Sequence, residues 1–296
     1  MFKKLYNRFC NESIVGRFVY INVAVYIIAA FIGVFSTLFN VNYWLNEYIC
    51  FIELPASFER LLWQPWSIVT YMFVHERMLH ILFNMIALYS FGRIFLNFFS
   101  VRHFVGVYLF GGIVGGLSFM LAFNTFPYFD GMVDGAYLVG ASASALAILT
   151  ATATRSPNYI VSLPLFGSMR LVTITVVIVI IYLLLLVSEN AGGNFAHLGG
   201  VFAGWLFAFM LNKGKDLTSL INKIIDFLAT IFKRRRNPKK VEFTYQRGGR
   251  EADYEYNAQK KSNEQEIDKI LEKVKSGGYA SLTEEEKKRL FDASQR

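Results

Sequence analysis

A serine, two histidines and an asparagine stand in three short motifs of this 296-residue chain. The motifs are His80-Ile-Leu-Phe-Asn84, Gly140-Ala-Ser142-Ala-Ser144 and Ala196-His197-Leu-Gly-Gly200. A serine hydroxyl is a poor nucleophile unless a neighbouring base accepts its proton, and histidine is the usual base. Ser142 and His197 could form such a pair. His80, Asn84 and the Ser142 backbone N–H could then donate hydrogen bonds to the oxyanion of an acyl transfer.

Ser144 is the rival nucleophile. It lies about 200° around a helix from Ser142, so the two hydroxyls cannot face the same partner. We predict that Ser142 is the nucleophile and that Ser144 hydrogen-bonds within its own helix. No carboxylate stands near His197, so the expected catalytic unit is a dyad. Four histidines do not predict a metal site, because His103 falls at the other end of the spans and the rest lack carboxylate or thiol neighbours. We expect no metal and no cofactor.

The composition indicates that these motifs lie in a membrane. The chain is 54% hydrophobic and 18% charged, whereas soluble domains are about 45–50% apolar and about 25% charged. Two cysteines exclude a disulfide framework and a four-cysteine zinc site. The net charge of +8 arises mainly after residue 212, so we expect a membrane protein with a basic cytosolic tail and no nucleic-acid partner.

Six stretches approach the ~20 apolar residues that a membrane-crossing helix needs. The predicted fold is therefore an all-α polytopic bundle of six helices. The fifth stretch is β-branched, but an open strand cannot cross a bilayer. The stretches are 18–39, 78–99, 103–123, 136–154, 171–187 and 194–211.

Lysine and arginine flank the spans on one side, which predicts that both termini are cytosolic in the cell membrane. Spans two, four and six then enter from outside, and each motif falls within roughly 10 Å of the outer boundary. Small-residue strings usually serve helix packing, and we assign Gly140, Gly200 and Gly204 that supporting role. The shared depth of all three motifs favours catalysis over packing alone.

These residues in this order resemble the rhomboid family of intramembrane serine proteases, over about residues 15–212. The resemblance implies a helical bundle that cleaves transmembrane segments of other membrane proteins near the outer face. Carried over by position, Ser142 would be the nucleophile and His197 the general base. His80, Asn84 and the Ser142 amide would form the oxyanion hole. The loop 40–77 would lie partly in the membrane, span 171–187 would be the lateral gate, and 188–193 would cap the site.

Three positions depart from the family pattern. Ala143 replaces the usual glycine after the serine, and Ser67 stands where an arginine often follows Trp66. Leu146 replaces an aromatic residue that packs on the histidine in many members. None of these changes removes a proton-transfer group, so we expect them to affect rate and substrate choice.

The remaining chain is divided by composition. An amphipathic helix followed by a basic run predicts contact with the lipid bilayer at its inner leaflet. The last segment reads as a helical hairpin with a capping box at Thr283-x-x-Glu286, expected to bind a cytosolic partner or itself. The predicted parts are an N-terminal segment 1–17, a membrane domain 18–212, a juxtamembrane segment 213–240, a linker 241–263 and the hairpin 264–296.

Two other functions remain open. A catalytically inactive rhomboid-like protein could bind membrane clients, although such proteins typically lack the serine or histidine that this chain retains. A small transporter would need broken helices and charges at the bilayer midplane. Arg93 is the one strong charge within a predicted span, and it lies toward the cytosolic end.

Overall fold

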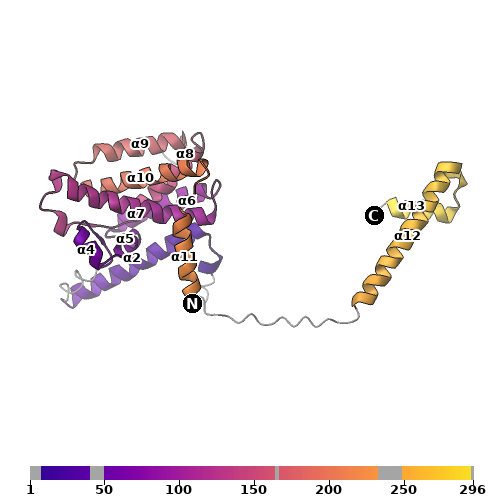
Figure 1. Cartoon of the computed structure of the whole chain (residues 1–296), viewed down its shortest axis with the longest axis horizontal. Coiled ribbons are helices and arrows are strands. Elements are labelled where there is room, and N and C mark those ends of the chain that lie inside the picture. The colour runs from indigo at the N-terminus through magenta and orange to yellow at the C-terminus, as the bar shows by residue number, and fades with distance from the viewer. Residues whose placement is uncertain (1–7, 41–49, 164–166, 233–248, 295–296) are drawn as a thin grey trace. The chain divides into compact units, whose positions relative to one another are not determined.

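The computed structural model describes residues 8–40, 50–163, 167–232 and 249–294. The chain forms two compact units, Met1–Lys233 and Arg234–Arg296. All six stretches predicted as spans contain a helix in the first unit (Figure 1). These helices are α2 (Ile14–Leu38), α6 (Met78–Phe95), α7 (Val101–Thr125), α8 (Ser142–Arg155), α9 (Leu171–Leu184) and α10 (Ala191–Asn212).

Shorter elements connect these helices. Those before α6 are β1 (Leu54–Pro55), α4 (Phe58–Trp63), α5 (Ser67–Thr70) and η1 (Tyr71–Phe73). Those after α7 are η2 (Pro127–Phe129), η3 (Val133–Gly135), β2 (Tyr137–Leu138), β3 (Ile160–Leu163) and β4 (Gly167–Arg170). α11 (Ser219–Phe232) follows α10 in the same unit.

The predicted all-α polytopic fold is confirmed, but the helices differ in length. Within the described residues, α2, α6, α7 and α10 are long and apolar enough to cross a membrane. α8 and α9 have 14 residues each, about 21 Å at 1.5 Å per residue. That is shorter than a hydrocarbon core of ~30 Å.

The fourth span was predicted to begin at residue 136, and this boundary was wrong. Residues 137–138 form β2, which pairs antiparallel with β1, so that Leu54 faces Leu138. Gly140 then adopts a φ of +117°, which residues with a side chain rarely adopt. A right-handed helix cannot run through that conformation, so α8 begins at Ser142.

α8 is enclosed by α7 and α10, and the residues from Ala143 to Ala153 are all buried. Glycines make the close packing possible. A Cβ at Gly200 or Gly204 of α10 would come within 2.2 Å of the backbone oxygens of Ala143 and Ala147. These close approaches fit the packing role predicted for Gly200 and Gly204, because a glycine lets two helix backbones come into contact.

Two tyrosines attach the segment before α6 (residues 50–77) to α7. The Tyr71 hydroxyl donates to the Gly112 carbonyl at 2.6 Å, and the Tyr108 hydroxyl donates to the Met72 carbonyl at 3.0 Å. The Gly140 amide also donates to the Tyr71 carbonyl at 3.0 Å. The loop therefore supports the turn that precedes Ser142. Its membrane association stays a prediction.

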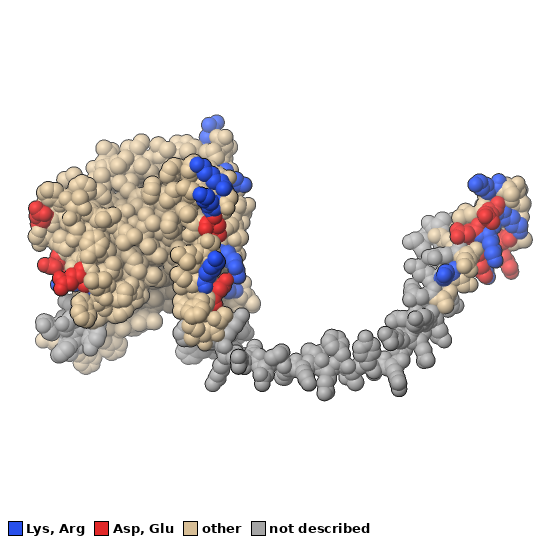
Figure 2. Space-filling view, in the orientation of Figure 1, with Lys and Arg blue, Asp and Glu red and all other residues tan. Residues whose placement is uncertain are grey.

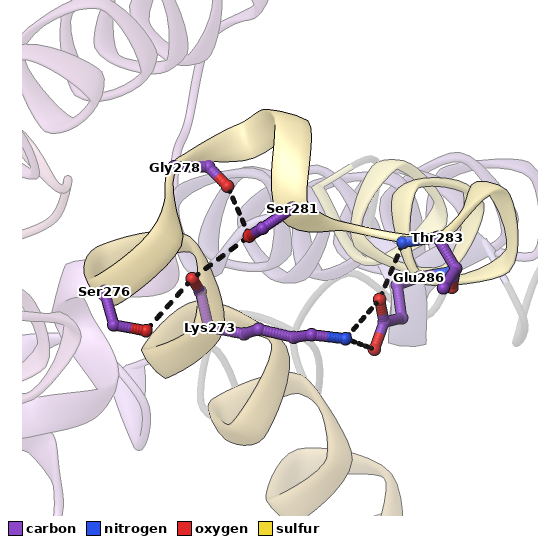
Figure 3. A network of polar contacts seen from close by, with 6 residues as sticks. All are labelled: Lys273, Ser276, Gly278, Ser281, Thr283 and Glu286. Atoms are coloured by element: carbon purple, nitrogen blue, oxygen red, sulfur yellow. Dashed lines mark hydrogen bonds and ion pairs between the residues drawn. The ribbon is translucent and has the colours of Figure 1, made fainter.

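The second unit is a helical hairpin of α12 (Gly249–Gly277), η4 (Tyr279–Ser281) and α13 (Glu284–Ser294). The predicted linker 241–263 was too long, because α12 already begins at Gly249; residues 241–248 lie outside the described ones. The capping box is confirmed. The Thr283 amide donates to a Glu286 carboxylate oxygen at 2.8 Å, and Lys273 pairs with the same carboxylate (Figure 3).

Candidate active site

Ser142 and His197 lie within hydrogen-bond distance where α8 and α10 approach each other. His197 Nε2 lies 2.7 Å from Ser142 Oγ. Ser142 is the first residue of α8, and His197 occupies the second turn of α10. The glycine contacts three and seven residues beyond His197 hold the two helix backbones together. The hydroxyl and the base that the sequence singled out are therefore brought together.

The role of a base requires one particular tautomer of His197. A neutral imidazole that carries its proton on Nδ1 accepts the serine hydroxyl proton at Nε2. Nδ1 of His197 is buried and has no hydrogen-bond partner within the described part of the chain. No third residue orients this ring by a hydrogen bond within the described residues, and the two side chains form a pair there.

The start of α8 supplies backbone donors. Ala141 occupies the N-cap position and makes no side-chain cap. The first N–H groups of a helix have no acceptor within the helix, and the helix dipole favours negative charge at this end. The Ser142 amide therefore stands where it can stabilise an oxyanion that forms beside the Ser142 hydroxyl.

His80 and Asn84 from α6 border the same turn. A Cβ at Gly140 would lie 2.9 Å from His80 Nε2 and 3.5 Å from Asn84 Nδ2. The Asn84 nitrogen is buried and has no partner within the described residues. Leaving such a donor unpaired costs about 1–3 kcal/mol, so the site favours a ligand with an acceptor oxygen at this point. The His75 ring lies next to the His80 ring, with centroids 5.2 Å apart.

Ser144 corrects one prediction. It is fully buried, but its hydroxyl has no hydrogen-bond partner within the described residues, so the predicted bond within its own helix does not form. A helical serine can bond to a carbonyl one turn earlier, but the Ala141 carbonyl at that place accepts the Ala145 amide at 2.9 Å and no bond from Ser144.

Sequence reasoning missed an aromatic neighbour of the base. Tyr182, in the last turn of α9, lies against His197 with ring centroids 4.3 Å apart and planes inclined by 49°. Leu146 was the signal that could have pointed to Tyr182. Because α8 offers no aromatic side chain at position 146, one from another helix could be expected against the imidazole. Asn194 was also missed: its amide donates to the Leu185 carbonyl at 2.7 Å and fixes the connection between α9 and α10.

A family model described as a Rhomboid domain matches residues 62–214, more than half of the chain. The chain belongs to the rhomboid family. Residues 251–296 match a second model, described as a family of unknown function (DUF6576). None of the curated proteins compared with the chain matches it. The Rhomboid domain and the long apolar helices together make this a multi-pass membrane protein.

The structure accounts for two of the three departures of this rhomboid from the family pattern. The Ala143 methyl group is accommodated by Gly115 of α7, where a Cβ would come within 2.6 Å of it. Leu146 is buried in a small cluster against which Tyr182 packs. Ser67 is fully buried and begins α5, and nothing in the structure explains the missing arginine.

Proposed function

We propose that this rhomboid is an intramembrane serine endopeptidase that cleaves transmembrane segments of other membrane proteins. The observation that carries the proposal is the 2.7 Å contact between Ser142 Oγ and His197 Nε2. It gains support from the unpaired Asn84 amide and the uncapped start of α8 beside the same hydroxyl. A packing role for these residues requires neither feature.

The proposed reaction has two halves. In the first, Ser142 Oγ attacks the scissile carbonyl carbon while its proton moves to His197 Nε2. The resulting imidazolium then protonates the leaving amine, the C–N bond breaks, and an acyl-serine ester remains. In the second, water attacks the ester, gives one proton to His197 and releases the carboxylic acid. Ser142 recovers its proton, so the net change is hydrolysis of one peptide bond.

The tetrahedral intermediates carry a negative oxygen that needs donors. The candidates are the Asn84 amide and the His80 ring, which border Gly140, and the Ser142 backbone N–H, two residues after Gly140. Any side chain at Gly140 would enter the space that His80 occupies. This is the reason we assign Gly140 to the oxyanion site as well as to backbone geometry.

In the membrane orientation that we propose, this site lies near the outer face of the cell membrane (plasma or inner), and both termini lie in the cytosol. Its support is the uneven distribution of charge on the first unit. Figure 2 shows lysine and arginine gathered along the side that includes α11, with some carboxylates among them, whereas the opposite side shows mainly carboxylates. Basic residues favour the cytosolic side.

The alternative is a catalytically inactive rhomboid that binds membrane clients. Active-site labelling distinguishes the two. Purified protein in detergent is treated with a fluorophosphonate, and a transmembrane model substrate is cleaved in parallel. We expect wild type and Ser144→Ala to label and cleave, and Ser142→Ala and His197→Ala to do neither. A folded wild type that neither labels nor cleaves would favour client binding.

A further inference from the structure

Tyr182 is the only described aromatic side chain in ring contact with His197, and it comes from a helix outside the dyad. The centroids are 4.3 Å apart. The imidazole is otherwise held by one hydrogen bond, between Nε2 and Ser142 Oγ, because Nδ1 has no partner within the described residues. A ring held at one atom can turn about its side-chain torsions, and a second contact on its face restricts that rotation.

The cluster around Tyr182 shows why α9 supplies this contact. Leu146 follows Ser142 by one helical turn and therefore faces the same side of α8. Leu146 and Leu149 form a buried cluster, and the Tyr182 ring packs against it. A leucine at position 146 has no aromatic face to offer the imidazole, and Tyr182 supplies one from the neighbouring helix.

α9 is attached mainly through its first half. Its buried residues are Leu171, Ile174 and Thr175. Near its end, Leu183 and Leu184 are exposed, and α9 runs along the edge of the bundle beside α10 and α8 (Figure 1). The contact with His197 is therefore made by the less buried half of a peripheral helix.

We propose that Tyr182 is a positioning residue that holds the His197 imidazole with Nε2 directed at Ser142. This rests on the proposed function, in which His197 is the base. Aromatic contacts of this kind change an equilibrium about 2- to 10-fold. We expect removal of the ring to lower kcat by that factor with KM little changed, because the contact is to the base and not to the substrate.

The test compares full-length wild type with Tyr182→Ala, Tyr182→Phe and Tyr182→Leu in detergent. Ile178→Ala is the matched control, since Ile178 packs against the same cluster of α9 and α8 residues but makes no ring contact. The readouts are the rate of fluorophosphonate labelling, kcat, KM and the pH–rate profile. Tyr182→Ala and Tyr182→Leu should both slow labelling and shift the pH of half-maximal activity. Tyr182→Phe and Ile178→Ala should retain wild-type values.

The outcomes separate this inference from the proposed function. If Tyr182→Leu labels at the wild-type rate with an unchanged pH profile, or if Tyr182→Phe loses as much as Tyr182→Leu, the positioning role is wrong. If Ser142→Ala still labels and cleaves, the proposed function itself is wrong. Tyr182→Leu keeps the apolar volume, so the comparison holds even if the alanine variant fails to fold.

A second inference rests on α11, whose apolar face is exposed in the part of the chain that the structure describes. Its exposed residues recur at helical spacing and share one side of the helix. They are Leu220, Ile224, Phe227, Leu228 and Ile231. The other side is attached to the start of α7, where Thr218 is buried against Gly106 and Asp226 pairs with Arg102 at 3.4 Å.

A cavity of about 360 Å³ lies at the same end of the bundle. Arg155, His103 and Asn212 line it together with Phe98 and Leu211. Arg155 donates to the Asn212 side-chain oxygen at 2.8 Å and has no carboxylate partner within the described residues. His103 lies 3.6 Å from a carboxylate oxygen of Asp216, so Arg155 is the lining cation that can meet a phosphate group beside the apolar walls. Figure 2 shows lysine and arginine gathered on the side of the unit that includes α11.

We infer that this end of the protein binds the phosphate of an anionic phospholipid, with the apolar face of α11 lying in the membrane interface. The full-length protein in neutral detergent is titrated with phosphatidylglycerol, phosphatidylcholine or inorganic phosphate, and its unfolding temperature is measured. Phosphatidylglycerol should stabilise wild type most, and Arg155→Gln should lose that difference while Lys223→Gln on α11 keeps it. If inorganic phosphate stabilises wild type as much as phosphatidylglycerol does, the ligand of this site is a free anion and not a lipid. Equal effects of both lipids on wild type would overturn the inference.

Discussion

The α-carbon of Gly200 lies against the carbonyl oxygen of Ala143, so close that a Cβ there would come within 2.2 Å of that oxygen. Gly200 follows His197 by three residues, and Ala143 follows Ser142 directly. The dyad is thus set by a contact between two backbones, in which no flexible side chain can adjust. A substitution that adds one methyl group at this contact should therefore move His197 relative to Ser142.

Gly200→Ala should displace α10 from α8 and reduce both stability and activity. Overpacking of a tight interior costs about 1–3 kcal/mol, and backbone atoms cannot rotate away. Unfolding in denaturing detergent and the labelling rate measure the two effects. Gly33→Ala in α2 is the matched control, because nothing lies within 4 Å of a Cβ there. A Gly200→Ala protein that labels at the wild-type rate would contradict this account of the dyad.

Gly115 and Ala143 should show strong coupling. Gly115→Ala places a methyl group within 2.6 Å of the Ala143 methyl, and Ala143→Gly removes the second partner of that clash. We expect the double variant to be more stable than the sum of the single changes, by about 0.5–3 kcal/mol. The rescue will be partial, because the new methyl also approaches the Ala196 carbonyl at 2.9 Å. Additive effects would mean that Gly115 does not accommodate Ala143.

Asn84→Ala should lower kcat by about 10²- to 10³-fold, the usual loss when one oxyanion donor is removed. Stability should not fall, because the Asn84 nitrogen has no partner within the described residues and an unpaired buried donor itself costs the folded protein free energy. Asn124→Ala supplies the contrast. Its amide donates to the Ala56 carbonyl at 2.9 Å, so that variant should lose stability and keep kcat. Wild-type turnover in Asn84→Ala would remove Asn84 from the proposed oxyanion site.

Glu53, which immediately precedes β1, should make the free energy of unfolding depend on pH. Its side chain is 8% exposed, and burial together with the nearby Glu76 raises the pKa of its carboxyl to about 7. The unfolded chain loses this proton near pH 4.5 and the folded chain near pH 7. Stability should therefore fall as pH rises between these values. Glu53→Gln should match wild type at pH 4 and exceed it at pH 8 by on the order of 1–3 kcal/mol.

Thermal unfolding at pH 4, 5.5 and 8 measures this difference. Glu59→Gln, exposed on α4, is the control and should show no such trend. His75 should have the opposite effect on the pH dependence of stability. Burial and the neighbouring His80 lower its pKa to about 4, so its contribution should be lost as pH falls from 6.5 toward 4. A Glu53→Gln difference that does not vary with pH would contradict the Glu53 prediction.

Thr283→Ala should loosen the terminal hairpin without affecting proteolysis. The variant loses the bond from the Glu286 amide to the Thr283 hydroxyl, which measures 3.3 Å. Loss of an N-cap typically costs ~1 kcal/mol, so hydrogen exchange across α13 should accelerate about fivefold. Glu285→Gln in the same turn serves as the control. Cleavage of the model substrate that falls in parallel with α13 protection would assign the tail a regulatory role.

The sequence alone was enough to predict the candidate chemistry and to place the main helices. Each catalytic candidate lies in a short motif, and helical spacing places His80 and Asn84 on one face without knowledge of the fold. Long apolar stretches also form helices for a local reason, because backbone groups in lipid must be satisfied within the segment. The capping box at Thr283 and Glu286 followed from the same local logic.

The tertiary structure decided what depends on contacts between segments far apart in the chain. The start of α8 at Ser142 follows from strand pairing between Leu54 and Leu138 and from the turn at Gly140. The space for Ala143 is provided by Gly115 on another helix. Tyr182 meets His197 only because α9 packs beside α10, and no periodicity in either helix specifies that contact.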